Sequence, residues 1–367
     1  MRKYLLSSGE GRCPGGGRFR RKAASVEWHD SRNTQPQCNG LLPNVKRSGA
    51  PWAISDGRAG NARQAEALAA ALAGPAMLPA PALVLQPHMP WRWLAPRRLP
   101  GAAQAYGPAF AALLQQPPAL AIGCGRQAAL ATRLLRARGS AVVQVLDPRL
   151  SPRHWDVVVV PEHDRLRGDN VLTLLGSLHP IDDAWLAAAR AAFPHFGALP
   201  SPRIAVLVGG PATLAPWTAE AAASVFGHLA TQLRDSGGSV LASTSRRTPP
   251  AVAAALRNAF TGVPGVVWCG EDAGANPYAG LLGWAERIVC TPDSVNLLSE
   301  ACATRVPVAV AMPTSARGRA RDFHAALRAR GRLADAPDGH GAVAGTIEPL
   351  RETARIATRI RERLQLD

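Results

Sequence analysis

Short apolar runs alternate with longer helical stretches along the chain from residue 51 onward. This alternation is typical of parallel sheets whose strands are joined by crossover helices. Up to residue 192, the apolar runs predict strands at PWAIS, PALVLQP, PALAIGC, AVVQVLD, WDVVVVP and NVLTLLGSLH. Helical stretches are expected between them at 61–73, 104–116 and 126–138.

The same pattern starts again after a connection rich in Pro and Gly at 193–203. Strands are expected at RIAVLVGG, SVLAST, GVVWCG, RIVCT and VPVAVAM, and helices at 217–236, 249–260, 277–286, 293–304, 317–330 and 346–365. We therefore predict an α/β protein with two Rossmann-like parallel-sheet domains, 51–197 and 198–345, followed by a C-terminal helix within 346–367. Because ligands of such sheets bind beyond the carboxyl ends of the strands, a cleft between the two facing domains is the expected site.

Charge separates the first 50 residues from the rest. Residues 1–50 hold ten Lys and Arg against three Asp and Glu, and they lack the apolar core of a signal peptide. We expect a disordered tail or a mis-annotated start, with the true start near Val45. All three lysines lie in this segment, so the remainder cannot supply a P-loop or Schiff-base lysine. Kinases, P-loop ATPases and class I aldolases are thereby excluded.

The six cysteines form no C-x-x-C pair, which argues against a zinc or iron–sulfur site. Four of them lie in apolar or small-residue surroundings that are typical of reduced, buried thiols. No apolar run approaches the ~18 residues of a membrane span. These features predict a cytoplasmic protein.

The segment TPDSVNLLSEA at 291–301 carries the strongest candidate site. Asp293 or Ser294 is placed to cap a helix whose free N–H groups attract a phosphate. Glu300 lies about two turns further on, where its carboxylate can accept hydrogen bonds from ribose hydroxyls. The plain alternative is that Glu300 is a solvated helical glutamate.

Two other strand ends of the second domain suit a nucleotide. In GGP, the glycines allow a backbone to approach a phosphate or sugar closely, or they form a simple tight turn. In STSRRTP, arginines beside hydroxyls suit a diphosphate, or they are solvated loop residues. The residues concerned are Gly209 and Gly210, and Thr244, Ser245, Arg246 and Arg247.

The first domain offers a glycine turn and two candidate bases. SDGRAGN has Gly57 and Gly60 in a G-x-x-G spacing, which is a weak dinucleotide signal. Asp56 can act as a base, anchor an acceptor sugar or cap the next helix, and Asn61 is a candidate cap as well. His163 in PEHD is suited to acid–base chemistry, or it belongs to a polar loop.

No Asp-x-Asp occurs in the chain, so no metal cofactor is expected, and arginines and helix N-termini would stabilise a diphosphate instead. The segment at 87–101, PHMPWRWLAPRRLPG, mixes Trp and Met with Arg. It suits a membrane surface or a phosphate-bearing acceptor, or its tryptophans fill the core. No specific nucleic-acid partner is expected, since the domains lack lysine and a clear basic and aromatic platform.

The motifs SDGRAGN, LDPR, VVVPEHD, NVLTLLGSLH, GGP, TSRRTP, NPY and TPDSVNLLSEACAT together resemble the Elongated-Mitochondria-type mitochondrial fission family over about 51–365. That family resembles GT-B glycosyltransferases and nucleotide-sugar 2-epimerases, and many of its bacterial members carry a nucleoside-diphosphate-sugar epimerase label. The resemblance implies a bacterial protein whose second domain holds the nucleotide, with Glu300 at the ribose. It also implies that Gly57 and Gly60 face diphosphate and acceptor, and that the last helix crosses back to the first domain.

The leading hypothesis is a GT-B-like, metal-independent glycosyltransferase, or nucleotide-sugar-binding protein, that uses a nucleoside-diphosphate sugar. Ser294, Arg246 and Arg247 would hold the diphosphate, and Asp56 or His163 would serve a lipid-linked or envelope acceptor as base. Such a protein would work in the cytoplasm, with peripheral contact at the inner membrane through 87–101. The alternatives are a nucleoside-diphosphate-sugar epimerase and a non-catalytic fission-family adaptor at a membrane surface.

Overall fold

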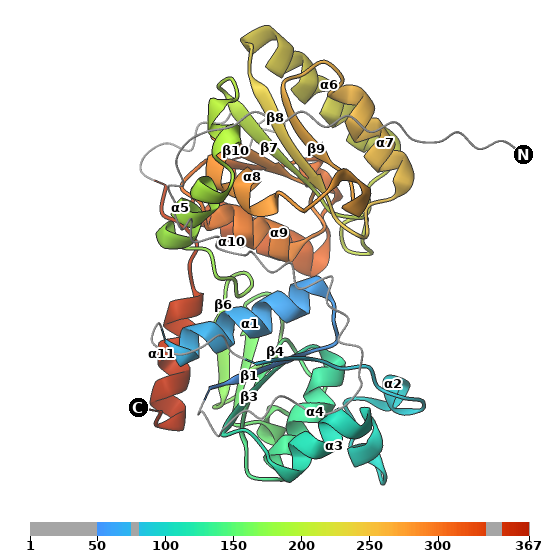
Figure 1. Ribbon diagram of the computed structural model, residues 1–367, viewed down its shortest axis with the longest axis vertical. Coiled ribbons are helices and arrows are strands. Elements are labelled where there is room, and N and C mark those ends of the chain that lie inside the picture. The colour runs from blue at the N-terminus through green and yellow to red at the C-terminus, as the bar shows by residue number, and fades with distance from the viewer. Residues whose placement is uncertain (1–49, 75–80, 335–346, 367) are drawn as a thin grey trace, which may run out of the picture. The chain divides into compact units, whose positions relative to one another are not determined.

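The computed structural model describes residues 50–74, 81–334 and 347–366, so the predicted tail lies almost wholly outside the described residues. Within these ranges the strands form two parallel sheets with helices packed on them (Figure 1). The GT-B-like pair of α/β sheets expected from the sequence is thereby confirmed.

The first sheet has six strands in the order β2-β1-β3-β4-β5-β6, all parallel. Strands β3 and β5 are buried at every position, which is why they read as uninterrupted apolar runs. The strands are β1 (Trp52–Ser55), β2 (Ala82–Val84), β3 (Leu120–Cys124), β4 (Ala141–Val145), β5 (Val157–Pro161) and β6 (Val171–Leu174). In chain order, the helices up to residue 192 are α1 (Ala59–Ala73), α2 (Trp91–Leu94), α3 (Gly107–Gln115), α4 (Arg126–Arg136) and α5 (Asp183–Ala192).

The second sheet has five parallel strands in the order β11-β10-β7-β8-β9. The strands are β7 (Arg203–Val208), β8 (Ser239–Thr244), β9 (Gly265–Trp268), β10 (Arg287–Cys290) and β11 (Val308–Val310). In chain order, the helices after residue 203 are α6 (Ala219–Ser236), α7 (Pro250–Ala259), α8 (Tyr278–Trp284), α9 (Val295–Cys302), α10 (Gly318–Ala329) and α11 (Thr353–Leu364).

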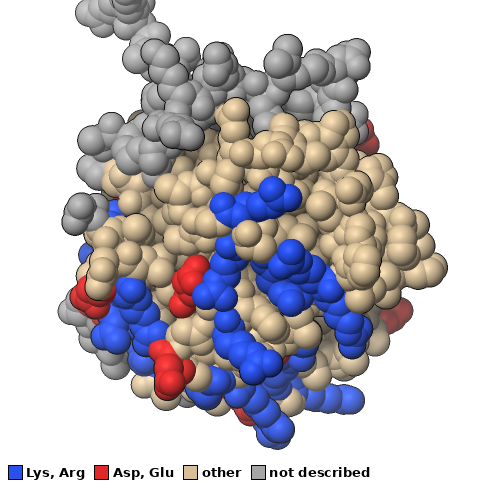
Figure 2. All heavy atoms as spheres, turned by 90° about the horizontal axis from the view of Figure 1, so that it is seen from below, with Lys and Arg blue, Asp and Glu red and all other residues tan. Residues whose placement is uncertain are grey.

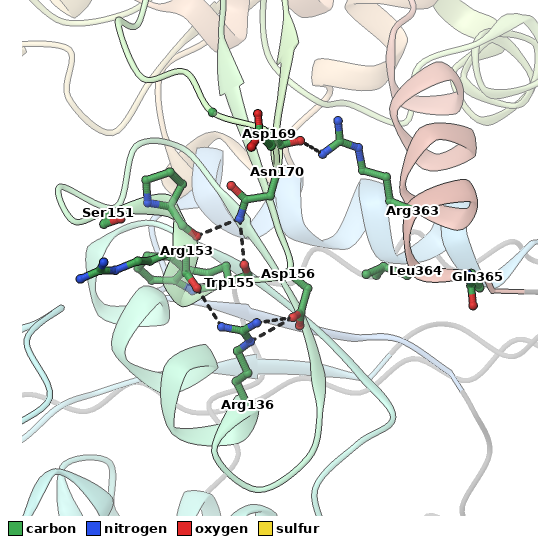
Figure 3. Close-up of a pocket in the computed structure, with 12 residues that line it drawn as sticks. Arg136, Ser151, Arg153, Trp155, Asp156, Asp169, Asn170, Arg363, Leu364 and Gln365 are labelled. Atoms are coloured by element: carbon green, nitrogen blue, oxygen red, sulfur yellow. Dashed lines mark hydrogen bonds and ion pairs between the residues drawn. The ribbon is translucent and has the colours of Figure 1, made fainter.

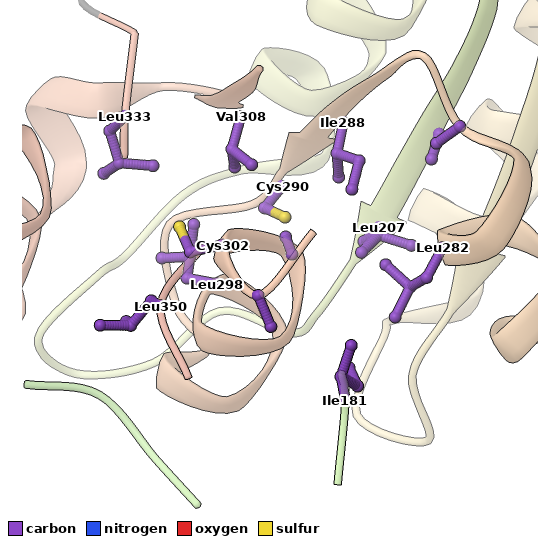
Figure 4. Packing of buried hydrophobic residues seen from close by; sticks show 14 of the residues in the cluster. Ile181, Leu207, Leu282, Ile288, Cys290, Leu298, Cys302, Val308, Leu333 and Leu350 are labelled. Atoms are coloured by element: carbon purple, nitrogen blue, oxygen red, sulfur yellow. The ribbon is translucent and has the colours of Figure 1, made fainter. Parts of the chain in front are cut away.

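One core cluster lies between the second sheet and helices α8 and α9 (Figure 4). It contains Leu207 and Ile288 from the strands, Leu298 from α9, and the thiols of Cys290 and Cys302. Burial raises the pKa of the Cys302 thiol to about 12, so this group stays protonated at neutral pH. The cysteines in the described residues are free and largely buried, as predicted.

Helix α5 was not expected from the sequence. Asp182 caps it by accepting a hydrogen bond from the backbone N–H of Trp185 at 2.7 Å. The helix packs against α8, and Leu186 belongs to the core cluster of the second sheet. The domain boundary at 197/198 stays a prediction.

The last helix returns to the first sheet. Ile356, Ala357 and Ile360 of α11 lie in a core cluster with residues of β3, β5 and α1. The Arg361 guanidinium donates hydrogen bonds to the carbonyls of Ala71 and Leu72 at the end of α1. The chain that follows the second sheet thus completes the packing of the first.

Candidate functional site

Each sheet has a topological switch point, where the connections that follow two neighbouring strands run in opposite directions along the sheet. In the first sheet this point lies between β1 and β3, and in the second between β7 and β10. Open parallel sheets bind ligands at the carboxyl ends of such strand pairs. The loops that follow these strands carry Asp56 and Gly57 in the first sheet, and Gly209, Gly210 and Asp293 in the second.

Asp293 joins three segments at the second of these points. Its side chain is fully buried, and Oδ2 accepts hydrogen bonds from the Gly210 N–H at 2.9 Å and from Arg247 Nη2 at 3.0 Å. Oδ1 accepts from Trp217 Nε1 at 3.1 Å. Asp293 therefore fixes the loops after β7 and β8 to the loop after β10.

Of Asp293 and Ser294, the two residues predicted to cap helix α9, Ser294 is the cap. Ser294 Oγ accepts a hydrogen bond from the Leu297 N–H at 3.3 Å. The first N–H groups of a helix have no partner within the helix, and their dipoles favour an anion. Helix α9 therefore presents a suitable end for a phosphate at this point.

The two glycines after β7 are required by the protein's own atoms. A Cβ on Gly209 would lie 2.2 Å from Asp293 Oδ2, and one on Gly210 would lie 2.3 Å from the Arg247 carbonyl oxygen. Arg247 also donates from Nη1 to the Gly210 carbonyl at 3.2 Å. The close approach that the sequence suggested is thus made here by neighbouring loops.

In the loop after β8, one of the two arginines pairs with Asp293 and the other has no partner among the described residues. Thr244 is buried, and Ser245 forms a turn in which its N–H donates to Thr248 Oγ1 at 3.0 Å. Arg247 is held by Asp293, whereas Arg246 is exposed and makes no hydrogen bond or ion pair with any described residue. Arg246 is therefore available to an anionic ligand.

Glu300 lies at the centre of a buried network. Its carboxylate is 2% exposed and accepts from Arg63 Nη1 at 2.6 and 2.8 Å and from Tyr278 Oη at 2.5 Å. Glu300 raises the pKa of the Arg63 guanidinium, while burial, followed by the nearby carboxylate, raises the pKa of Tyr278. Glu300 is thus not a solvated glutamate, and sequence reasoning had not assigned a role to Arg63 or Tyr278.

The predicted glycine turn of the first sheet lies against α9. A Cβ on Gly60 would lie 2.0 Å from Asn296 Nδ2, and Gln64 Nε2 donates to Asn296 Oδ1 at 3.4 Å. Gly57 has a φ of +75°, which explains glycine there. Helices α1 and α9, which follow strands β1 and β10, are therefore in contact.

The candidate base Asp56 has partners in its own loop. Asp56 Oδ1 accepts from the Arg58 N–H at 3.2 Å and from Asn61 Nδ2 at 2.9 Å. The prediction that Asn61 caps the helix is wrong, because α1 begins at Ala59 and Asn61 lies inside it. Asn61 instead uses its side chain to hold Asp56.

The other candidate base lies after β5. The His163 ring lies 5.4 Å from the ring of Phe323 in α10, and burial lowers the pKa of its imidazole. The neighbouring Asp164 pairs with Arg319, also in α10, at 2.5 Å. His163 thus packs in a contact between the PEHD loop and α10, and its role as a base stays a prediction.

A buried histidine behind the Asp293 loop predicts acid sensitivity. Burial, aided by Arg328, lowers the pKa of His324 from 6.5 to about 4. The stability that the uncharged His324 contributes is therefore fully present well above pH 6.5. It is lost as the pH falls from 6.5 toward 4, since in this range only the unfolded chain takes up the proton. We expect His324→Gln to reduce the loss in unfolding free energy between pH 7 and pH 4.5 by about 2 kcal/mol. Urea titrations at both pH values measure this, with exposed His195→Gln as the control, and an unchanged difference contradicts it.

A surface pocket of about 630 Å³ lies apart from these residues (Figure 3). Arg136 pairs there with Asp156 at 2.7 Å, and Arg363 donates to the Asp169 carbonyl. None of the predicted site residues lines it.

In the described ranges, no three His, Cys, Asp or Glu side chains are placed to hold a metal ion. No helix in that part has the length and apolar character needed to cross a membrane.

Two curated proteins are similar to this chain in sequence. The mitochondrial fission protein ELM1 of Arabidopsis thaliana is 32% identical over 276 residues, which covers 67% of this chain and 64% of that protein. The uncharacterized protein RP120 of Rickettsia prowazekii is 26% identical over 305 residues, which covers 71% of this chain and 83% of that protein. This chain thus spans less than two thirds of the Arabidopsis protein.

A solved structure supports the fold. S. aureus MnaA, determined with UDP, matches with a TM-score of 0.50 at 12% identity, covering 86% of this chain and 97% of that one. The model of the family described as Mitochondrial fission ELM1 matches residues 59–364. This chain therefore belongs to the mitochondrial fission ELM1 family.

Proposed function

We propose that this chain binds a nucleoside-diphosphate sugar at the carboxyl edge of its second sheet and transfers the sugar to an acceptor. The observation that carries the proposal is the exposed, unpaired Arg246 in the loop after β8, next to Arg247, which reaches Asp293 beside the start of α9. Helix N–H groups and a guanidinium both suit a diphosphate. The MnaA structure, which shares the fold, was determined with UDP.

Glu300 would bind the ribose of this ligand. Its carboxylate already accepts from Arg63 and Tyr278, so ribose hydroxyls would replace one of these donors. Arg63 is the better candidate, because its side chain is 38% exposed and has room to turn away. The released guanidinium would then be available to the diphosphate.

Transfer would break the bond between the anomeric carbon and the diphosphate oxygen and form a bond to an acceptor oxygen. Asp56 or His163 would take the acceptor's proton, and Arg246 with the start of α9 would stabilise the charge that develops on the leaving diphosphate. A lipid-linked or envelope acceptor would meet the loop after β1. Asp293 and Arg247 would act by fixing the loops, since their polar groups are paired with each other.

A binding role without chemistry is the second candidate. It is favoured by the engagement of both predicted bases, with Asp56 bonded to Asn61 and His163 packed on Phe323. A fission-family adaptor that senses a nucleotide sugar would need the binding residues and no base. An epimerase would need acid–base groups around one sugar and no acceptor.

Product analysis separates these functions. The full chain is incubated with UDP-N-acetylglucosamine labelled in the sugar, with and without a bacterial membrane fraction as acceptor. We expect label in a new glycoside together with free UDP, and loss of both in Arg246→Ala but not in the exposed control Arg257→Ala. If the product is an isomerised sugar nucleotide, the function is epimerisation and not transfer. If the sugar nucleotide is bound but chemically unchanged, only the binding role remains.

A further inference from the structure

One long stretch of the chain around the first sheet contains arginines and no acidic residue. The 80 residues from 67 to 146 contain seven arginines and no Asp or Glu. Figure 2 shows Lys and Arg side chains gathered on the face of the molecule that lies at the bottom of Figure 1, the end at which α3 and α4 are drawn. Basic side chains therefore predominate on this face, with some acidic side chains among them.

The loop around α2 adds apolar side chains to this charge. Met89 is 54% exposed, Trp93 71% and Leu99 39%, whereas Trp91 packs against the core. The prediction that tryptophans of 87–101 fill the core thus holds for Trp91, and Trp93 of the same helix stands in solvent. Large apolar side chains are rarely left exposed together without a partner.

Helix α4 holds this loop in place. Arg126 Nη2 donates to the Arg92 carbonyl at 3.1 Å, and Arg133 Nη1 donates to the Pro96 carbonyl at 2.7 Å. The loop is thus bonded to helix α4 at Arg92, within α2, and at Pro96, just after it. Its exposed side chains are presented by an ordered scaffold.

Beside the loop, Arg98, Arg133, Arg136 and His154 line a surface pocket of about 350 Å³. Within the described part of the chain, neither Arg98 nor Arg133 forms an ion pair. Burial and the charge of Arg98 lower the pKa of Arg133, as expected where cations lack counter-charge. A lipid phosphate would supply the missing negative charge.

We propose that this arginine face, made of Met89, Trp93 and Leu99 with the neighbouring arginines of 92–98 and Arg133, docks onto an anionic lipid bilayer. Apolar side chains would enter the interface while arginines meet lipid phosphates, which is the combination that interfacial binding needs. Met and Leu do not stack on bases, and Trp93 is the one aromatic residue among the exposed large hydrophobics of the described chain. These features favour a bilayer over a nucleic acid.

Vesicle sedimentation of the full chain tests this proposal. Vesicles of phosphatidylcholine alone are compared with vesicles in which one quarter of the lipid is phosphatidylglycerol. We expect binding to the anionic vesicles only, lowered at least about twentyfold in Arg97→Glu/Arg98→Glu, since each arginine contributes about fivefold. Trp93→Ala should lower binding several-fold. The matched control Arg257→Glu/Arg330→Glu, on exposed arginines of the second half, should leave binding unchanged.

Three results would overturn the proposal. The first is equal binding to both kinds of vesicle. The second is unchanged binding of Arg97→Glu/Arg98→Glu to the anionic vesicles. Because this variant keeps the basic residues 1–50 of the wild type, such binding would not come from the arginine face. The third is failure to bind vesicles together with binding to a fluorescent single-stranded oligonucleotide that depends on Arg97 and Arg98. Circular dichroism of each variant ensures that the comparison is made between folded proteins.

Discussion

Replacing Asp293 by alanine is expected to lower the free energy of unfolding by about 3 kcal/mol. The carboxylate is fully buried and serves the Gly210 N–H and the Trp217 indole N–H, both of which would lose their partner. A buried donor without a partner is costly, and two of them account for most of the expected loss. The Arg247 guanidinium adds less, because its side chain is 55% exposed and can reach water. Urea denaturation at pH 7 measures the effect.

The expected effect of Asp293→Ala comes from its partners and not from the loss of charge alone. Asp293→Asn, which keeps an acceptor oxygen for one donor, should therefore fall between wild type and Asp293→Ala. Asp272→Ala removes an exposed carboxylate and serves as the control. A loss below about 1 kcal/mol for Asp293→Ala would show that the three loops do not depend on this side chain.

Breaking the ion pair between Arg63 and Glu300 should have unequal effects from its two sides. Arg63→Ala is expected to cost about 3 kcal/mol, because it leaves a carboxylate that is 2% exposed with Tyr278 as its remaining donor. Glu300→Gln should cost about 1 kcal/mol, since Arg63 is 38% exposed and can turn toward water. Thermal and urea denaturation of both variants give the comparison.

A surface arginine of the same loop region provides the matched control. Arg58 has a side chain that is 83% exposed and lies 3.7 Å from Asp56, so Arg58→Ala should change stability by less than about 0.5 kcal/mol. Equal costs for Arg63→Ala and Glu300→Gln, or a larger cost for the latter, would contradict the assignment of Glu300 as the more buried partner.

The fold was predictable because buried parallel strands leave a plain signal. The runs LAIGC of β3 and VVVVP of β5 are buried throughout, so every position is apolar. Helix α5 was missed, and its packing against α8, about 90 residues away, leaves no local signal in the sequence. The position of Asn61 was misjudged because Gly60 looked like part of a turn, whereas it lies in α1 where Asn296 approaches closely.

The location of the candidate site was predictable, and its internal pairing was not. Strand ends such as GGP and TPDS necessarily meet at one edge of a parallel sheet. No local pattern states that Asp293 will be used by Gly210 and Arg247, or that Glu300 will pair with Arg63, 237 positions away. Such pairs depend on how the elements pack. The availability of Arg246 follows only once these pairs are known.

Isothermal titration of UDP into the full chain tests the central claim most directly. We predict saturable binding to the wild type that is weakened on the order of tenfold or more in Arg246→Ala, because a charge-assisted hydrogen bond contributes about 1.5 to 3 kcal/mol. Binding to Arg257→Ala should match the wild type, and Glu300→Gln should weaken the binding of UDP more than that of inorganic pyrophosphate. No heat of binding with UDP, TDP, GDP or ADP, or equal affinity of Arg246→Ala and wild type, would contradict a nucleotide site at the carboxyl edge of the second sheet.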